Sequence, residues 1–110
     1  MAPELARIEC VGVHALDRRR VDVAVDLTPS CMEPLSLELV IVGPGDEELC
    51  SVLVIQSRDP MLDKVLHLRR DAEPGQHTLH VGLFLDEQLL DHAARLFEFP
   101  KPDMERGLDG

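Results

Sequence analysis

The chain has 110 residues, of which 45% are hydrophobic and 29% are charged, and its formal net charge is −10. This length fits one globular domain, and the apolar content excludes a disordered chain. The acidic balance argues against nucleic acid as a partner, because such binding depends on Lys and Arg contacts with phosphates. No stretch approaches the ~18 apolar residues of a membrane helix, and no secretory signal opens the chain. We therefore expect a cytoplasmic protein without a membrane partner.

The first half of the chain predicts four β-strands separated by turn residues. Residues 6–16 form a candidate first strand, and residues 21–27 alternate strictly between apolar and polar side chains, as a half-buried strand does. Between these strands, Arg18-Arg19-Arg20 is flanked by aspartates and is interpreted as a solvated turn. Residues 35–42 and 49–56 become apolar on both faces, which predicts central strands.

The second half predicts two more strands and one ambiguous segment. Residues 63–70 and 77–85 alternate again. Residues 87–97 fit either a closing strand or an amphipathic helix that Asp86 would cap. We expect a single β-sandwich domain over residues 1–100 and a flexible tail over residues 101–110, with an α+β fold as the alternative if residues 87–97 are helical.

A motif near the end of the chain carries a family resemblance. Its residues are Pro74, Gly75, His77, Leu79 and Val81, followed by a turn and a strand that ends at Phe97 and Phe99. This pattern resembles the last two strands of immunoglobulin-like and fibronectin type III-like modules. The resemblance implies an antiparallel sandwich of about seven strands, and it favours a strand for the ambiguous segment.

The chain also departs from that family pattern. The family's tyrosine, whose hydroxyl bonds backbone upstream, is replaced by His77, and an imidazole N–H could make the same bond. Leu79 stands where an antibody-type domain has its second cysteine, and the chain contains no Trp. Bacterial relatives include the sugar-binding domain appended to some polysaccharide exporters, so the resemblance implies a carbohydrate-binding module as one alternative.

The histidines raise the question of a transition-metal site. His77 and His80 are three residues apart on a strand and should point to opposite faces. His67 and His80 are candidate ligands if their strands are neighbours, and Met61, Met32 or Cys31 would suit copper(I). The alternative interpretation places His67, His80 and His92 on the surface of a sheet and His77 at a corner.

Cysteines and acidic residues give no catalytic or calcium motif. The three cysteines are an odd number and fit a reducing compartment. Cys10 and Cys50 lie in apolar runs and should behave as small hydrophobes, whereas Cys31 lies between prolines and should be the accessible thiol. The acidic turns at residues 46–48 and 86–87 lack the ligand spacing of a calcium loop. Without a nucleotide-binding or nucleophile motif, we expect no enzyme activity and no cofactor.

These observations predict a non-enzymatic binding or assembly module that acts through protein contacts. Apolar residues on both faces of residues 37–42 and 52–55 indicate that an outer face is covered, and a homodimer would cover it. His67, His80 and Phe84 form the candidate interaction surface. The alternatives are the carbohydrate-binding module and a His/Met/Cys metal-binding domain.

Overall fold

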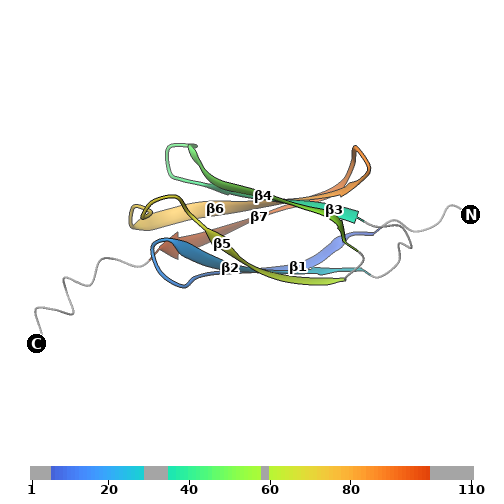
Figure 1. The fold of residues 1–110 in the computed structure, drawn as a ribbon, viewed down its shortest axis with the longest axis horizontal. Helices are drawn as coiled ribbons and strands as arrows, with labels where there is room; N and C mark the ends of the chain where they lie inside the picture. Colours follow the sequence, from blue (N-terminus) through green and yellow to red (C-terminus); the bar gives the residue numbers. More distant parts are fainter. Residues whose placement is uncertain (1–5, 29–34, 58–59, 100–110) are drawn as a thin grey trace, which may run out of the picture.

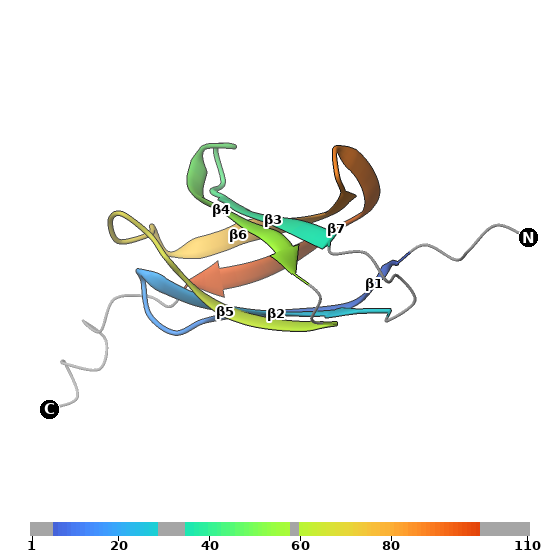
Figure 2. The ribbon, with the colours of Figure 1, turned by 45° about the vertical axis from the view of Figure 1, so that its right-hand side comes forward.

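Two antiparallel sheets face each other in the computed structural model, which describes residues 6–28, 35–57 and 60–99. The first sheet has the order β1-β2-β5, with β1 at Ile8–Ala15, β2 at Arg20–Leu27 and β5 at Met61–His67. The second has the order β4-β3-β6-β7, with β4 at Glu48–Ser57, β3 at Leu35–Val42, β6 at Gly75–Leu85 and β7 at Gln88–Phe99. Figures 1 and 2 show the two sheets as separate layers. The predicted all-β sandwich of about seven strands is confirmed, and it is consistent with an immunoglobulin-like fold.

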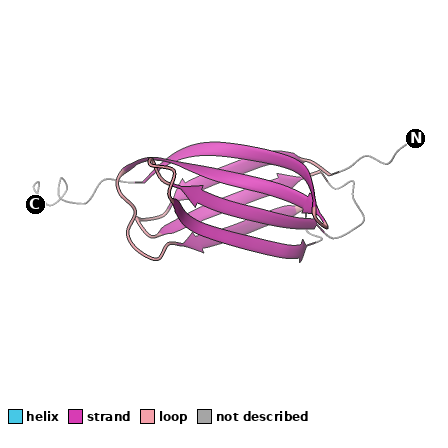
Figure 3. Cartoon of the chain, turned by 90° about the horizontal axis from the view of Figure 1, so that it is seen from above, coloured by secondary structure: helices cyan, strands magenta, loops and turns pink. Residues whose placement is uncertain are grey.

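The ambiguous segment at residues 87–97 is a strand, so the helical alternative is wrong. A two-residue turn at Asp86 and Glu87 joins β6 to β7, and Asp86 has a positive φ of 54°, as residues of tight hairpin turns do. Ala93 and Ala94, which favoured a helix, pair instead with Val81 and His80 of β6. Within the described ranges no helix is long and apolar enough to cross a membrane. Strands account for all the regular structure in Figure 3, and the loops lie at their ends.

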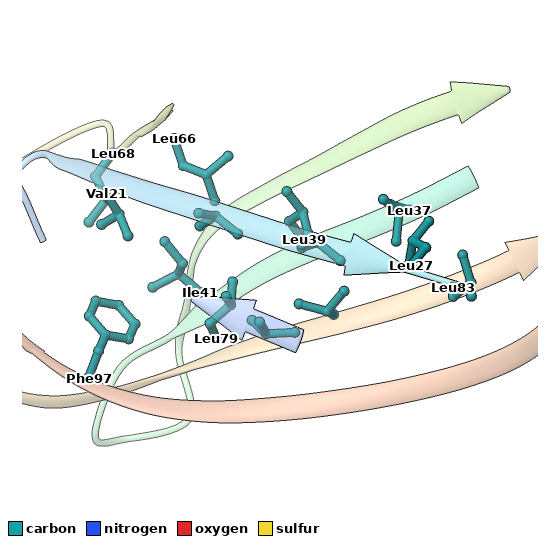
Figure 4. Close-up of a cluster of buried hydrophobic side chains, with 14 of the residues drawn as sticks. Val21, Leu27, Leu37, Leu39, Ile41, Leu66, Leu68, Leu79, Leu83 and Phe97 are labelled. Atoms are coloured by element: carbon teal, nitrogen blue, oxygen red, sulfur yellow. The ribbon is translucent and has the colours of Figure 1, made fainter. Parts of the chain in front are cut away.

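The core forms because alternate residues of both sheets point into the space between the layers. In the four-stranded sheet, Leu39, Ile41, Leu79 and Val81 have no exposed surface. The three-stranded sheet contributes side chains opposite them, and Figure 4 shows the two sets interleaved. The buried residues of the three-stranded sheet include Val21, Val23, Val25, Leu27 and Leu66.

Two strands, β3 and β4, carry apolar residues on both faces, but only β3 lies inside its sheet. β3 lies between β4 and β6, so its prediction as a central strand is confirmed. The same prediction for β4 is wrong, because β4 forms an edge of its sheet. Its outward side chains Leu53 and Ile55 are exposed, and no strand or loop among the described residues covers them.

A β-bulge in the last hairpin decides which side chains of β7 face outward. Next to the turn, Phe84 pairs with Leu89, but beyond the bulge Leu83 pairs with Asp91 and Gly82 with His92. The extra residue shifts the alternation of β7 by one position relative to a regular two-residue hairpin. His92 consequently faces outward, while Phe97 faces the core.

The arginine run closes one end of the sandwich. Arg18 Nε donates to the carbonyl of Ala72 at 3.0 Å, and the Ala72 amide donates to the Arg18 carbonyl at 2.7 Å. Arg19 donates to the carbonyl of Arg69 at 2.6 Å. Arg20 contacts Asp17 at 2.8 Å. The side chains predicted to form a solvated turn therefore also fasten the β1–β2 turn to the β5–β6 loop.

Candidate functional site

The outer face of the four-stranded sheet exposes several large apolar side chains, and we call it the apolar face. Leu53, Ile55, Leu89 and Leu96 are 53–64% exposed on it, which is unusual for side chains of this size grouped on one surface. Val40, Val42 and Phe84 lie among them half-buried. The pairing registers place these residues on the face: Glu38, Val40, Val42, Leu53, Ile55, His80, Gly82, Phe84, Leu89, His92, Ala94 and Leu96. They also place further polar residues on it: Ser36, Glu48, Ser51, Gln76, Thr78 and Glu98.

Gly82 has no side chain, and the ring of Phe84 lies over its backbone on the apolar face. A Cβ at this position would lie 2.9 Å from Cε1 of the Phe84 ring and 3.7 Å from Cδ1 of Leu89. The ring therefore covers the glycine backbone, and Gly82 is buried although it faces outward. Phe84, predicted as an interaction residue, lies on the face half-buried, with its ring over Gly82.

The structure brings together a pair of histidines different from the predicted pair. His67 lies on β5 and His80 on β6, which belong to different sheets, so the expected contact between them is wrong. The chain crosses from one sheet to the other between β5 and β6, a change that strand spacing does not reveal. His80 instead approaches His92, with Nδ1 and Nε2 separated by 3.4 Å. Both of these histidines lie on the sheet surface, as does His67.

His77 occupies the corner position that the family resemblance assigns to a tyrosine. Its ring is 2% exposed, and Nδ1 lies 3.0 Å from the carbonyl oxygen of Gly75, two residues upstream. The ring packs edge-on against Phe99 with ring centres 4.7 Å apart. The imidazole thus makes an upstream backbone contact of the kind expected for the family's hydroxyl, and its role is structural.

An open pocket of about 700 Å³ lies at the end of the sandwich closed by the arginines. The β3–β4 turn and the β5–β6 loop form its walls, with His77 at its base. Its lining residues are Glu47, Glu48, Leu49, Leu68, Arg69, Arg70, Asp71, Ala72, Glu73 and His77. Charges of both signs line this pocket and no Phe does, so it offers no platform on which a sugar ring could stack.

Neither predicted set of metal ligands is assembled as a group. In the portion of the chain that the structure describes, no three His, Cys, Asp or Glu side chains are placed to hold a metal ion. Met61 lies on β5, on the opposite sheet from His80. Cys31 and Met32 fall outside the described residues, so the predicted accessibility of Cys31 and its copper(I) role stay predictions.

The two described thiols differ in their surroundings. Cys10 is exposed, so its prediction as a buried hydrophobe is wrong. It lies on the outward side of β1, because Val11 takes the inward position. Cys50 is half-buried, and burial, together with the negative charge of Glu48, raises the pKa of its thiol. Neither cysteine has the electropositive setting of a reactive thiolate.

The outer face of the three-stranded sheet is acidic, and we call it the acidic face. Asp22, Asp26 and Asp63 lie on it, from β2 and β5. A hydrogen bond between the Asp63 and Asp22 carboxyl groups, together with their like charge, raises the pKa of Asp63 above its usual 3.8. The cause is the close approach of two exposed carboxyl groups, whose like charges disfavour the simultaneous ionisation of both.

Comparison with known proteins adds information about the fold. No family model matches the chain, and no curated protein matches it. Among solved structures, it is similar to part of a proposed beta-galactosidase from Bacteroides fragilis, with a TM-score of 0.56 and 14% sequence identity. The match covers 86% of this chain but 18% of that protein. The likeness therefore supports the sandwich architecture, and the chain corresponds to less than a fifth of the larger protein's length.

Proposed function

We propose that the chain is a non-enzymatic assembly module that forms a homodimer through the apolar face. One observation carries this proposal: large apolar side chains project from both edge strands of the four-stranded sheet. Leu53 and Ile55 come from β4, and Leu89 and Leu96 come from β7. Removing such side chains from water is favourable by about 25 cal/mol for each Å² of apolar area. Exposed apolar patches of this kind are typical of protein interaction sites.

The distribution of charge supports a copy of the same chain as the partner. Charged residues make up 29% of the sequence, and among the described residues the pairing registers place Glu38, Glu48 and Glu98 on the apolar face and no Lys or Arg. A basic partner would be attracted to the acidic face rather than to this one. A second apolar face is the surface whose chemistry best matches it, and a two-fold axis would allow each copy to cover the other.

The size of the face fits a small dimer interface. Taking the eight residues of β3, the shortest strand of this sheet, as the length gives strands about 26 Å long. Four such strands about 4.8 Å apart give roughly 500 Å² of flat sheet on each copy. Two copies would then bury about 1,000 Å², which is the lower limit for a specific interface. We therefore expect a dimer that dissociates on dilution rather than a permanent one.

Sedimentation velocity over a range of protein concentrations tests the proposal. We expect the wild-type chain to form dimers and Leu53→Lys to remain monomeric. Met61→Lys is the matched control, because Met61 is 69% exposed on the other sheet and its replacement should leave the dimer intact. Circular dichroism of both variants would verify that they fold. A wild-type chain that stays monomeric at the highest attainable concentration would contradict the proposal.

A carbohydrate-binding module is the second candidate, and the likeness to part of a proposed beta-galactosidase favours it. Sugar sites generally use an exposed aromatic ring as a platform. Phe97 and Phe99 are buried, so Phe84 is the aromatic side chain that could serve. Binding to a glycan array that disappears in Phe84→Ala would favour this function, whereas no binding to any glycan would exclude the array's sugars as ligands.

A further inference from the structure

We propose that His80 and His92 form a zinc-binding site on the apolar face, with both imidazole rings bound to one Zn²⁺ ion. The site uses β6 and β7, which are paired by backbone hydrogen bonds and so hold the two rings at a fixed separation. Both ligands come from one chain, so the site does not need the proposed dimer, although that dimer would cover it. Imidazole nitrogen is a preferred ligand of zinc.

The distance between the two nitrogen atoms supports a shared ion. Zn–N bonds of about 2.0–2.1 Å at a tetrahedral angle separate two ligand nitrogens by about 3.3–3.4 Å. The Nδ1 atom of His80 and the Nε2 atom of His92 are 3.4 Å apart. A direct N–H···N hydrogen bond would be expected nearer 3.0 Å. The observed spacing therefore suits a bridging ion better than a direct bond between the rings.

The arrangement of the rings is also compatible with one ion between them. An ion about 3.2 Å from each ring centre, at the tetrahedral angle, places the ring centres roughly 5.2 Å apart. The centres of His80 and His92 are 5.5 Å apart, and the ring planes are inclined by 30°. Small rotations of the side chains would be enough to direct both nitrogen atoms at a common point.

The surrounding structure leaves room for the ion and fixes one of its ligands. His80 lies opposite Ala94, whose methyl group leaves space beside the ring. Asp91 accepts a hydrogen bond from the His92 amide at 2.9 Å with Oδ1, and one from the Ile8 amide at 2.9 Å with Oδ2. These bonds fasten the backbone at His92 to β1. The exposed carboxylate of Glu38, on the next strand, contributes negative charge that favours a cation.

The predicted site is open and exchangeable. Structural zinc sites use four protein ligands, whereas this one supplies two and leaves the remaining positions to water. Among the described residues no third ligand is in place, in agreement with the absence of a three-residue group. Zinc should therefore bind reversibly, without being required for folding.

Isothermal titration of ZnCl₂ into the reduced protein tests this inference, with His67→Ala as the control because His67 is exposed on the other sheet. We expect one zinc ion per chain, and at least about tenfold weaker binding in His80→Ala and in His92→Ala. The His67→Ala variant should bind like wild type. Equal affinity in wild type and the double variant His80→Ala/His92→Ala would overturn the site, as would an equal loss in His67→Ala.

Two further measurements separate the zinc site from folding and from the dimer. In long-range ¹H–¹⁵N spectra, zinc should shift His80 Nδ1 and His92 Nε2, while the His67 nitrogens stay in place. Unchanged spectra for His80 and His92 at saturating zinc would contradict the proposal. Because the proposed dimer would cover the two rings, the monomeric Leu53→Lys variant should bind zinc at least as tightly as wild type, and weaker binding in this variant would contradict a site within one chain.

Discussion

The two outer faces of the sandwich differ in chemistry although both belong to antiparallel sheets that pack on the same core. The acidic face carries Asp22, Asp26 and Asp63, with Met61 and Val65 exposed beside them. The apolar face exposes Leu53 and Leu96 and carries little charge. A sheet that covers a core on one side normally has a polar outer side, as the acidic face does. This difference is the basis of the proposed self-association.

The largest expected effect distinguishes the inner from the outer surface of the four-stranded sheet. Leu39 and Leu53 lie on neighbouring strands but on opposite faces, and Leu39 is fully buried. Leu39→Ala should lower the free energy of unfolding by about 2–5 kcal/mol, because it leaves a cavity in the core. Leu53→Ala should change the stability of the monomer by less than about 0.5 kcal/mol. Urea unfolding in dilute solution measures both values, and similar losses would show that Leu53 is not a free surface residue.

The next effect concerns the salt dependence of dimer formation. Each copy carries a net charge of −10, so two copies repel each other through their acidic surfaces. Raising the salt concentration from about 0.1 M to about 1 M shortens the screening length from about 10 Å to about 3 Å. The dimer dissociation constant should therefore fall several-fold, because the apolar contact itself is not weakened by screening.

Analytical ultracentrifugation at several salt concentrations measures this dependence. A dissociation constant that rises with salt would mean that ion pairs hold the copies together, and it would move the interface away from the apolar face. The Met61→Lys variant provides the control. Its lower net negative charge should reduce the repulsion and flatten the dependence on salt.

The smallest expected effect arises on the acidic face. Because the folded-state pKa of Asp63 is raised, protonation favours the native state, and this contribution is lost as the pH rises through that pKa. At neutral pH both carboxyl groups are charged and repel each other. Asp63→Asn should therefore be slightly more stable than wild type at about pH 7, and the advantage should disappear near pH 3.

Thermal unfolding followed by circular dichroism at both pH values tests this difference. Asp26→Asn is the control, because it removes a charge from the same face while leaving the Asp22–Asp63 pair in place. A stability gain for Asp63→Asn that is the same at both pH values would contradict the role of the shared proton. The gain should be smaller than either of the effects described above, since both carboxyl groups are exposed.

Alternation along single strands was sufficient to predict the sandwich. Val21 to Leu27 and Leu79 to Leu85 repeat with a period of two, and their apolar sides do form the core. Such patterns are local, because they depend on which side of one strand a residue occupies.

The site could not be predicted in the same way, because it depends on how strands pair. An uninterrupted two-residue hairpin would place His92 opposite Val81, facing the core. The bulge beyond Phe84 moves it opposite Gly82, facing outward beside His80. Similarly, strand spacing did not show that β5 and β6 belong to different sheets, which separates His67 from His80. Predicting which histidines meet would have required knowing the bulge in the last hairpin and the crossing between the sheets.

The direction of β1 and β7 has a mechanical consequence. The described chain enters near Arg7, beside Thr28, and leaves at Phe99, beside Gly75, at the opposite end of the sandwich (Figure 1). A tension applied through these two points would act along the strands. It would load the backbone hydrogen bonds of the β1–β2 and β6–β7 ladders in shear, so that many must break together instead of one after another. A force applied in this way would therefore meet the resistance of both ladders at once.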